Sequence, residues 1–150
     1  MQESLLRMIM AFVGALGFCM IFNLRRRLWL PAALGGLLSW EVYLLSHAVT
    51  GELFLATMAA AAFAALYAEI LARWLKAPAT LFLIPALVPM IPGSTLYYAM
   101  SAAVRQDWIL ARDFGAQTAQ YALGIAIGIS LVWALWEMAR NLRAGFGRRV

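Results

Sequence analysis

Prolines interrupt one of the most apolar stretches of the chain, "LIPALVPMIPGSTLYY". Pro85, Pro89 and Pro92 are spaced by four and then three residues, so on a helix they would share one face. Each proline removes a backbone donor and costs about 3 kcal/mol inside a helix. The pattern therefore predicts that residues 83–95 are unwound and buried in protein or beside a wet cavity. The alternative is a kinked helix whose prolines only pack.

The polar residues after the break have the chemistry to bind an anion. Pro92 suits the first position of a new half-helix, and Gly93 permits close approach to its backbone. The amides of Gly93, Ser94 and Thr95, with the two hydroxyls, would then be uncommitted donors at the positive end of a helix dipole. Such an end favours a carboxylate. Tyr97 follows within two turns and could add a hydroxyl to this site or serve only in aromatic packing.

Two acidic residues inside apolar runs are candidates for proton coupling. Glu41 lies near the middle of its run, where a charged carboxylate costs about 3 kcal/mol and protonation avoids much of that cost. A structural hydrogen bond to a neighbouring helix or subunit is the alternative. Glu69 has Arg73 four residues later, which predicts an ion pair near the end of a run. Glu137 is expected to pair with Arg140 in a similar way.

Other chemistry has few residues to use. Asn23 closes the stretch "GFCMIFNL" and could cap the preceding helix or hold a gate. The sequence has one cysteine, Cys19, and one histidine, His47, which excludes a cysteine-rich or histidine-rich metal site. It contains no phosphate-binding loop and no metalloprotease motif. We therefore expect neither a cofactor nor an enzyme activity.

These residues must be positioned by helices inside a bilayer. The 150 residues are 65% hydrophobic and 13% charged, with a mean hydropathy of +0.80, which is outside the range of a soluble domain. Apolar runs of about 20 residues predict an all-α integral membrane protein with about five spans in a single transmembrane domain. The predicted spans cover residues 5–24, 28–48, 53–72, 79–104 and 116–138. The fourth of them is the one that the prolines interrupt.

Basic residues are divided unevenly between the short connections, which predicts the orientation in the membrane. One side carries Arg25, Arg26, Arg27, Arg73, Lys76, Arg140, Arg143, Arg148 and Arg149. The other side carries only Arg7, Arg105 and Arg112. The excess predicts an N-terminus outside and a C-terminus in the cytoplasm. The net charge of +5 then reflects topology rather than nucleic-acid binding. In the outer fourth connection, "DWILARDF" is expected to lie along the membrane interface.

Small residues mark helix faces that can pack closely. They are Ala56, Ala60, Ala64 and Ala68 at every fourth position, and Gly124 and Gly128 in a G-x-x-x-G motif. These faces predict close packing, either within the chain or toward a partner.

At "GFCMIFNL" and "PALVPMIPGSTLYYAM" the sequence resembles the threonine/serine exporter superfamily, in particular the small stand-alone subunit paired with a larger one in bacterial succinate export. The resemblance covers nearly the whole chain. It implies a secondary exporter of small carboxylate metabolites that is active only with a larger multi-span partner, in the inner membrane of a bacterium. It also implies that the site includes Asn23, Pro89, Pro92, Gly93 and Tyr97.

Together these patterns predict one half of an exporter of the succinate or threonine/serine class, coupled to protons by antiport. Alternating access would occur around the broken segment, and a partner of opposite orientation would complete an inverted-repeat pair. The alternatives are a non-transporting assembly or scaffold subunit, whose prolines only shape packing, and a channel subunit. A higher oligomer also remains open.

Overall fold

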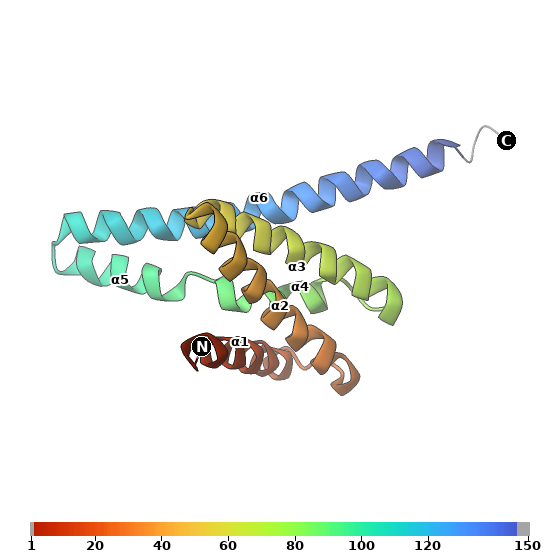
Figure 1. Cartoon of the computed structure of the whole chain (residues 1–150), viewed down its shortest axis with the longest axis horizontal. Coiled ribbons are helices and arrows are strands. Elements are labelled where there is room, and N and C mark those ends of the chain that lie inside the picture. The colour runs from red at the N-terminus through yellow and green to blue at the C-terminus, as the bar shows by residue number, and fades with distance from the viewer. Residues whose placement is uncertain (1, 147–150) are drawn as a thin grey trace.

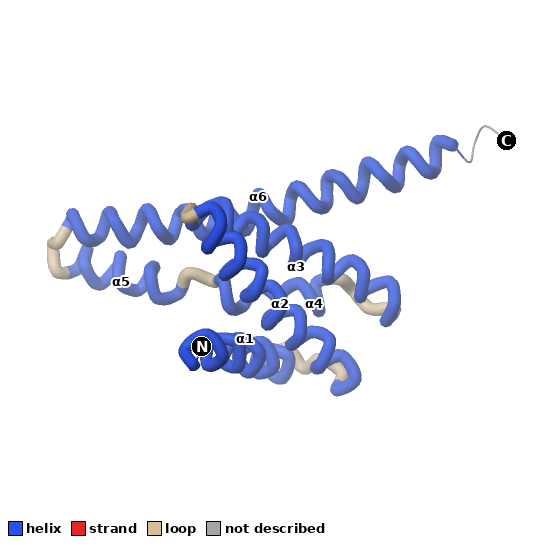
Figure 2. The backbone as a smooth tube through the Cα atoms, viewed as in Figure 1, coloured by secondary structure: helices blue, strands red, loops and turns tan. Residues whose placement is uncertain are grey.

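The computed structural model describes residues 2–146, with side chains from Leu6 to Asn141. The chain folds into α-helices joined by short turns, as predicted for an all-α protein (Figure 1 and Figure 2). The helices are α1 (Gln2–Ile21), α2 (Arg26–Thr50), α3 (Leu53–Leu75), α4 (Thr80–Leu87), the 3₁₀ helix η1 (Val88–Met90), α5 (Gly93–Val104) and α6 (Trp108–Phe146).

Several of these helices have the length and composition of membrane spans. Three of them, α2, α3 and α6, are long and apolar enough to cross a membrane, and α4 with α5 counts as a fourth if the pair is one bent span. The described side chains of α1, from Leu6 to Ile21, form a shorter apolar helix. The count of five spans therefore stays a prediction.

The last helix begins earlier than predicted. The segment "DWILARDF", expected along the interface, forms the last residue before α6 and its first turns, because α6 starts at Trp108 rather than near residue 116. Asp107 explains this start, since its Oδ1 accepts a hydrogen bond from the Leu110 amide at 3.1 Å and so caps the helix.

The alanine-rich helix α3 lies at the centre of the bundle, in contact with α2, α4 and α6. The predicted close-packing alanines, Ala56, Ala60, Ala64 and Ala68, are at most 1% exposed. Ala56 and Ala60 cluster with Tyr43 and Met90, while Ala64 and Ala68 cluster with residues such as Phe82. This face of α3 therefore packs inside the chain.

The glycines of α6 bring that helix against the backbone of α3. A Cβ at Gly124 would lie 3.0 Å from the carbonyl oxygen of Phe54, and a Cβ at Gly128 would collide with the carbonyl oxygen of Met58. Because no side chain larger than hydrogen fits at Gly128, the G-x-x-x-G motif serves the α3–α6 contact rather than a contact with another protein.

The helix α5 and the first half of α6 form a hairpin that extends from the rest of the bundle (Figure 1). Ala102 is the one buried residue of α5. Large apolar side chains on the hairpin are exposed, among them Leu96, Val104 and Ile109. This surface therefore faces lipid or another protein.

The turn between α1 and α2 and the turn between α3 and α4 lie at one end of the bundle, where Arg25, Arg27 and Lys76 line a common hollow. These three residues of the predicted basic group therefore lie together, and the orientation in the membrane stays a prediction. The side chain of Arg143 and the residues Arg148 and Arg149, which belong to the same predicted group, lie outside the described part of the chain.

Candidate functional site

The proline segment breaks the fourth apolar run. The axes of Thr80–Met90 and Gly93–Val104 differ by 53°. Between them, η1 makes one 3₁₀ turn and Ile91 is extended, with φ −64° and ψ 122°. The predicted interruption is therefore confirmed, and it lies at the two prolines of the η1–α5 junction, Pro89 and Pro92.

The interruption is shorter than predicted. Residues 83–87 are helical, because α4 continues through Pro85, and residues 93–95 already belong to α5. The ring of Pro85 is fully buried in the core, and this packing offsets the loss of one helical hydrogen bond. Pro92 is the residue before α5 rather than its first residue, with φ −78° and ψ 52°.

The donors at the start of α5 are partly committed, contrary to the prediction that all were free. The Gly93 amide donates to the carbonyl of Ile91 at 2.8 Å, and the Thr95 hydroxyl donates to the carbonyl of Pro92 at 3.1 Å. The amides of Ser94 and Thr95 have no acceptor among the described residues, as is normal in the first turn of a helix. Among the described residues, these two amides and the Ser94 hydroxyl therefore have no hydrogen-bond acceptor.

One side of the break is buried and the other is open. Met90 is 2% exposed and packs in the core, whereas Ile91 is 55% exposed and Ser94 is also exposed. A Cβ at Gly93 would meet nothing within 4 Å, and Tyr97 is 67% exposed. The uncommitted donors therefore lie at the open side of the break.

Two pairs of hydroxyl groups link neighbouring helices near the break. Thr118 Oγ1 of α6 lies 3.0 Å from Thr95 Oγ1. One turn further along α6, Tyr121 Oη lies 3.1 Å from Tyr43 Oη of α2. We call Thr95, Thr118, Tyr121 and Tyr43 the hydroxyl track. Of these four residues, only Thr95 was predicted as a site residue from the sequence. The spacing of Thr118 and Tyr121, on the face of α6 that carries Gly128, was the one available indication of the others.

A buried serine on α2 faces the same segment. Ser39 is 0% exposed, and its Oγ has no hydrogen-bond partner in the described chain. It lies between Gly36, where a Cβ would be 3.1 Å from the Pro85 carbonyl oxygen, and Tyr43, which packs with Met90. An unpaired buried hydroxyl is unfavourable, so this position suits a bound water or a polar group of a solute.

The class of protein follows from the family to which the sequence belongs. Residues 7–135 match the family described as "Threonine/Serine exporter, ThrE". The chain belongs to the threonine/serine exporter family. It is therefore a membrane protein of a transporter family, and the resemblance seen in the sequence is confirmed. No solved structure matches it.

In this exporter family member, the structure does not bring Glu41 to the break. Glu41 shares a face of α2 with Leu38 and Leu45, which are exposed, and not with Tyr43, which packs against Met90. Its Oε1 is buried, and nothing in the described chain donates a hydrogen bond to it. The structural hydrogen bond proposed as an alternative is therefore not made within this part of the chain.

The predicted pair of Glu69 with Arg73 is wrong. The Arg73 guanidinium instead lies over the ring of Trp136, 4.1 Å from its centroid, and no ion pair with Glu69 forms among the described side chains. A guanidinium stacks well on an indole face, and α6 supplies that face beside the end of α3. The pair of Glu137 with Arg140 is confirmed, with a distance of 2.7 Å.

Asn23 ends α1. It is left-handed, with φ 50°, its amide donates to the Met20 carbonyl at 3.0 Å, and the Leu24 amide donates to the Cys19 carbonyl at 3.0 Å. Asparagine tolerates this conformation better than most residues, so the predicted capping role is confirmed. A gating role for Asn23 in the exporter stays a prediction.

Proposed function

We propose that the chain is one half of a secondary exporter of small carboxylate metabolites, of the succinate or threonine/serine class, and that the start of α5 receives the substrate carboxylate. The observation that carries this proposal is a helix that begins inside a broken apolar run with the Ser94 and Thr95 amides uncommitted. These amides lie at the positive end of the α5 dipole, which favours an anion. Broken helices with ligand sites at the break recur in secondary transporters.

The proposal includes a larger multi-span partner. The irregular backbone at Ile91 and the first turn of α5 are open on one side. Unpaired backbone groups cannot face acyl chains, so protein or a protein-lined aqueous cavity must cover that side. A second subunit with the opposite orientation in the inner membrane would supply the cover and complete an inverted pair. In this arrangement the N-terminus is outside and the C-terminus is cytoplasmic.

The packing of the two half-helices supports alternating access around the break. Phe82 and Pro85 fix α4 in the core, while α5 makes its main contacts with α6. Because α4 and α5 pack against different neighbours, α5 can move about the η1–α5 junction while α6 stays packed on α3. The hydroxyl track lies near this junction, with Thr95 on α5 and Tyr43 on α2.

Glu41 is the first candidate for the residue that couples export to protons. Its buried Oε1 has no described donor, and protonation removes most of the cost of a carboxylate inside the membrane. Glu69 is the second candidate, since Arg73 is engaged with Trp136 instead.

Gly93→Leu tests the proposal. A Cβ at Gly93 would meet nothing within 4 Å, so a leucine can extend into the open ligand side of the break rather than into the core. Gly115→Leu is the matched control, because Gly115 of α6 has equally free space. Export of isotope-labelled succinate or threonine is measured in cells that also produce a larger subunit of the same superfamily, and complex formation is measured by co-purification.

We expect Gly93→Leu to reduce export by more than about tenfold while the complex forms normally, and Gly115→Leu to retain export. Unchanged export in Gly93→Leu contradicts the substrate site. Loss of complex formation supports a scaffold role instead. Passive movement of substrate down its gradient, with no dependence on pH, supports a channel.

A further inference from the structure

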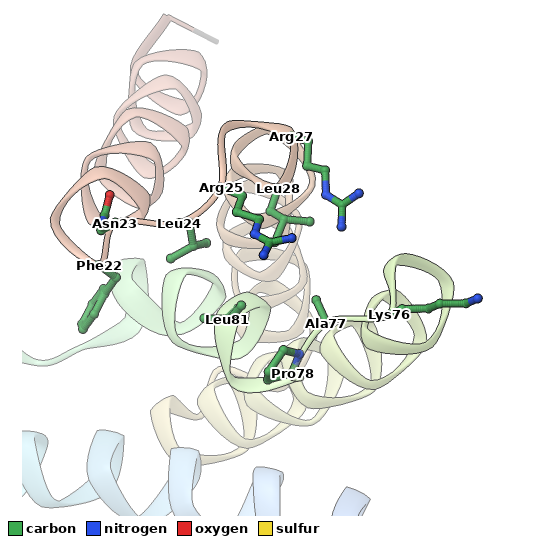
Figure 3. Close-up of a pocket in the computed structure, with 10 residues that line it drawn as sticks. All are labelled: Phe22, Asn23, Leu24, Arg25, Arg27, Leu28, Lys76, Ala77, Pro78 and Leu81. Carbon is green, nitrogen blue, oxygen red and sulfur yellow. The ribbon is translucent and has the colours of Figure 1, made fainter.

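A hollow of about 340 Å³ lies between the turn from α1 to α2 and the turn from α3 to α4 (Figure 3). Its walls are Phe22, Asn23, Leu24, Arg25, Arg27, Leu28, Lys76, Ala77, Pro78 and Leu81. The hollow is separate from the break. One end of α1, α2 and α4 builds the hollow, and the other end of each contacts η1. Its volume lies within the usual range for a small-molecule site.

All the charged residues that line the hollow are basic. Arg25, Arg27 and Lys76 line it, and no acidic residue does. Figure 3 shows Arg25 and Arg27 extending from the start of α2, while Lys76 reaches outward from the end of α3. Among the described side chains, none of these cations forms an ion pair. Arg25 and Arg27, without a described counter-ion, favour an anionic ligand, and Lys76 adds positive charge although its side chain reaches outward.

Helix ends of both signs border the hollow. The first turns of α2 and α4 border the hollow, and neither has a side-chain cap or an acidic residue. In contrast, the carbonyl ends of α1 and α3 are closed by backbone hydrogen bonds, from the Leu24 amide to Cys19 and from the Ala77 amide to Ala72, both at 3.0 Å. The positive ends of α2 and α4 thus lack a neutralising side chain, although the amides of Leu28, Leu81 and Phe82 already donate to backbone carbonyls.

The remaining walls are apolar. Phe22, Leu28 and Leu81 come from three different segments around the hollow. A ligand with an anionic oxygen group and a short hydrocarbon part fits such a mixed lining, because the cations bind its charge and the apolar walls cover its carbon atoms.

We propose that this hollow is an anion-binding site that takes a carboxylate or a phosphodiester group. Two sources carry this chemistry: the exported metabolite, which would dock here before it reaches the break, and the headgroup of an anionic lipid. The first source rests on the function proposed above. The second does not.

The test uses the purified full-length chain in nanodiscs of phosphatidylcholine. Succinate and dioctanoyl phosphatidylglycerol are the anionic probes, and dioctanoyl phosphatidylcholine is the neutral control. Binding is measured by titration and by the shift in melting temperature. The double variant Arg25→Gln with Arg27→Gln is compared with Arg105→Gln with Arg112→Gln, which removes the same charge from the turn between α5 and α6 and the start of α6. Lys76→Gln is a second, single variant.

We expect saturable binding of at least one anionic probe, weakened about tenfold or more in the Arg25/Arg27 double variant and unchanged in the Arg105/Arg112 variant. Lys76→Gln should weaken the same probe to a smaller extent. Binding of succinate identifies the metabolite as the source, and binding of phosphatidylglycerol alone identifies lipid. Absence of saturable binding, or equal weakening in both double variants, overturns the site. Gly93→Leu should leave these titrations unchanged, so failure of the anion site and failure of the proposed exporter function give different results.

Discussion

The hydroxyl groups of Tyr43 and Tyr121 lie 3.1 Å apart and join α2 to α6 beside the break. The two residues are 78 positions apart in the sequence, and their rings also lie within 6.2 Å of each other, centroid to centroid. This is a contact between side chains of two helices, inside a cluster that also holds Met90 of η1. The hydrogen bond therefore fixes the position of the core side of the break.

Removal of either hydroxyl should destabilise the fold. We expect Tyr43→Phe and Tyr121→Phe each to lower the free energy of unfolding by about 1 kcal/mol, because each leaves the other hydroxyl without its partner. The double variant should lose less than the sum of the two, since the second change removes an already unpaired group. Reversible unfolding in mixed micelles measures all three values. Simple additivity would mean that the two hydroxyls do not interact.

The contact of α6 with α3 should tolerate no side chain at Gly128. Gly128→Ala places a methyl group against the carbonyl oxygen of Met58, and we expect a loss of about 1–3 kcal/mol in unfolding free energy. Gly115→Ala, on the same helix with nothing within 4 Å, should be neutral or slightly stabilising because alanine favours the helix. Equal melting temperatures for the two variants would contradict the close α3–α6 contact.

Replacement of the prolines at the η1–α5 junction should restore helical hydrogen bonds. In Pro89→Ala combined with Pro92→Ala, we expect the Ser94 and Thr95 amides to exchange with deuterium at least about tenfold more slowly, because a continuous helix gives them acceptors. Pro31→Ala, inside α2, is the control and should leave this exchange unchanged. Export should fall in the double variant, since the proposed substrate donors become occupied. Unaltered exchange would show that packing, rather than proline, holds the break open.

Glu41→Gln should separate transport from the proton gradient. We expect substrate still to move down its own gradient, while the dependence of export on the pH difference is lost. Glu52→Gln is the control, because Glu52 is exposed in the turn before α3. Export measured in proteoliposomes with an imposed pH difference compares the two variants. Full pH dependence in Glu41→Gln would remove Glu41 from the coupling mechanism.

The break was predictable from the sequence because proline acts through the backbone, whatever surrounds it. Its length was not predictable, since the helix passes through Pro85 only because the core packs around that ring. The close-packing alanines of α3 were equally visible, as their periodicity is local. The prediction of an ion pair between Glu69 and Arg73 was wrong because it considered only nearby residues. Trp136, which is distant in the sequence, contacts the guanidinium instead.

Much of the site was invisible in the sequence because it depends on which helices become neighbours. Ser39 and Tyr43 look like ordinary residues of an apolar span until α4 and η1 pack against them. The hydrogen bond between Thr118 and Thr95 likewise exists only because α5 folds back along α6. Spacing along one helix can suggest a shared face, but it does not say what lies opposite.

The contact of Gly128 with the backbone of Met58 also sets how the protein can vary. Where two main chains touch, the only available changes are additions of atoms, so nearly every substitution there increases volume. In a saturation mutagenesis library, Gly124 and Gly128 should therefore be depleted of almost all variants, including those that preserve hydrophobicity. The outward side of α5 should accept most apolar replacements, and the contrast between the two would map the rigid and the adaptable parts of the transporter.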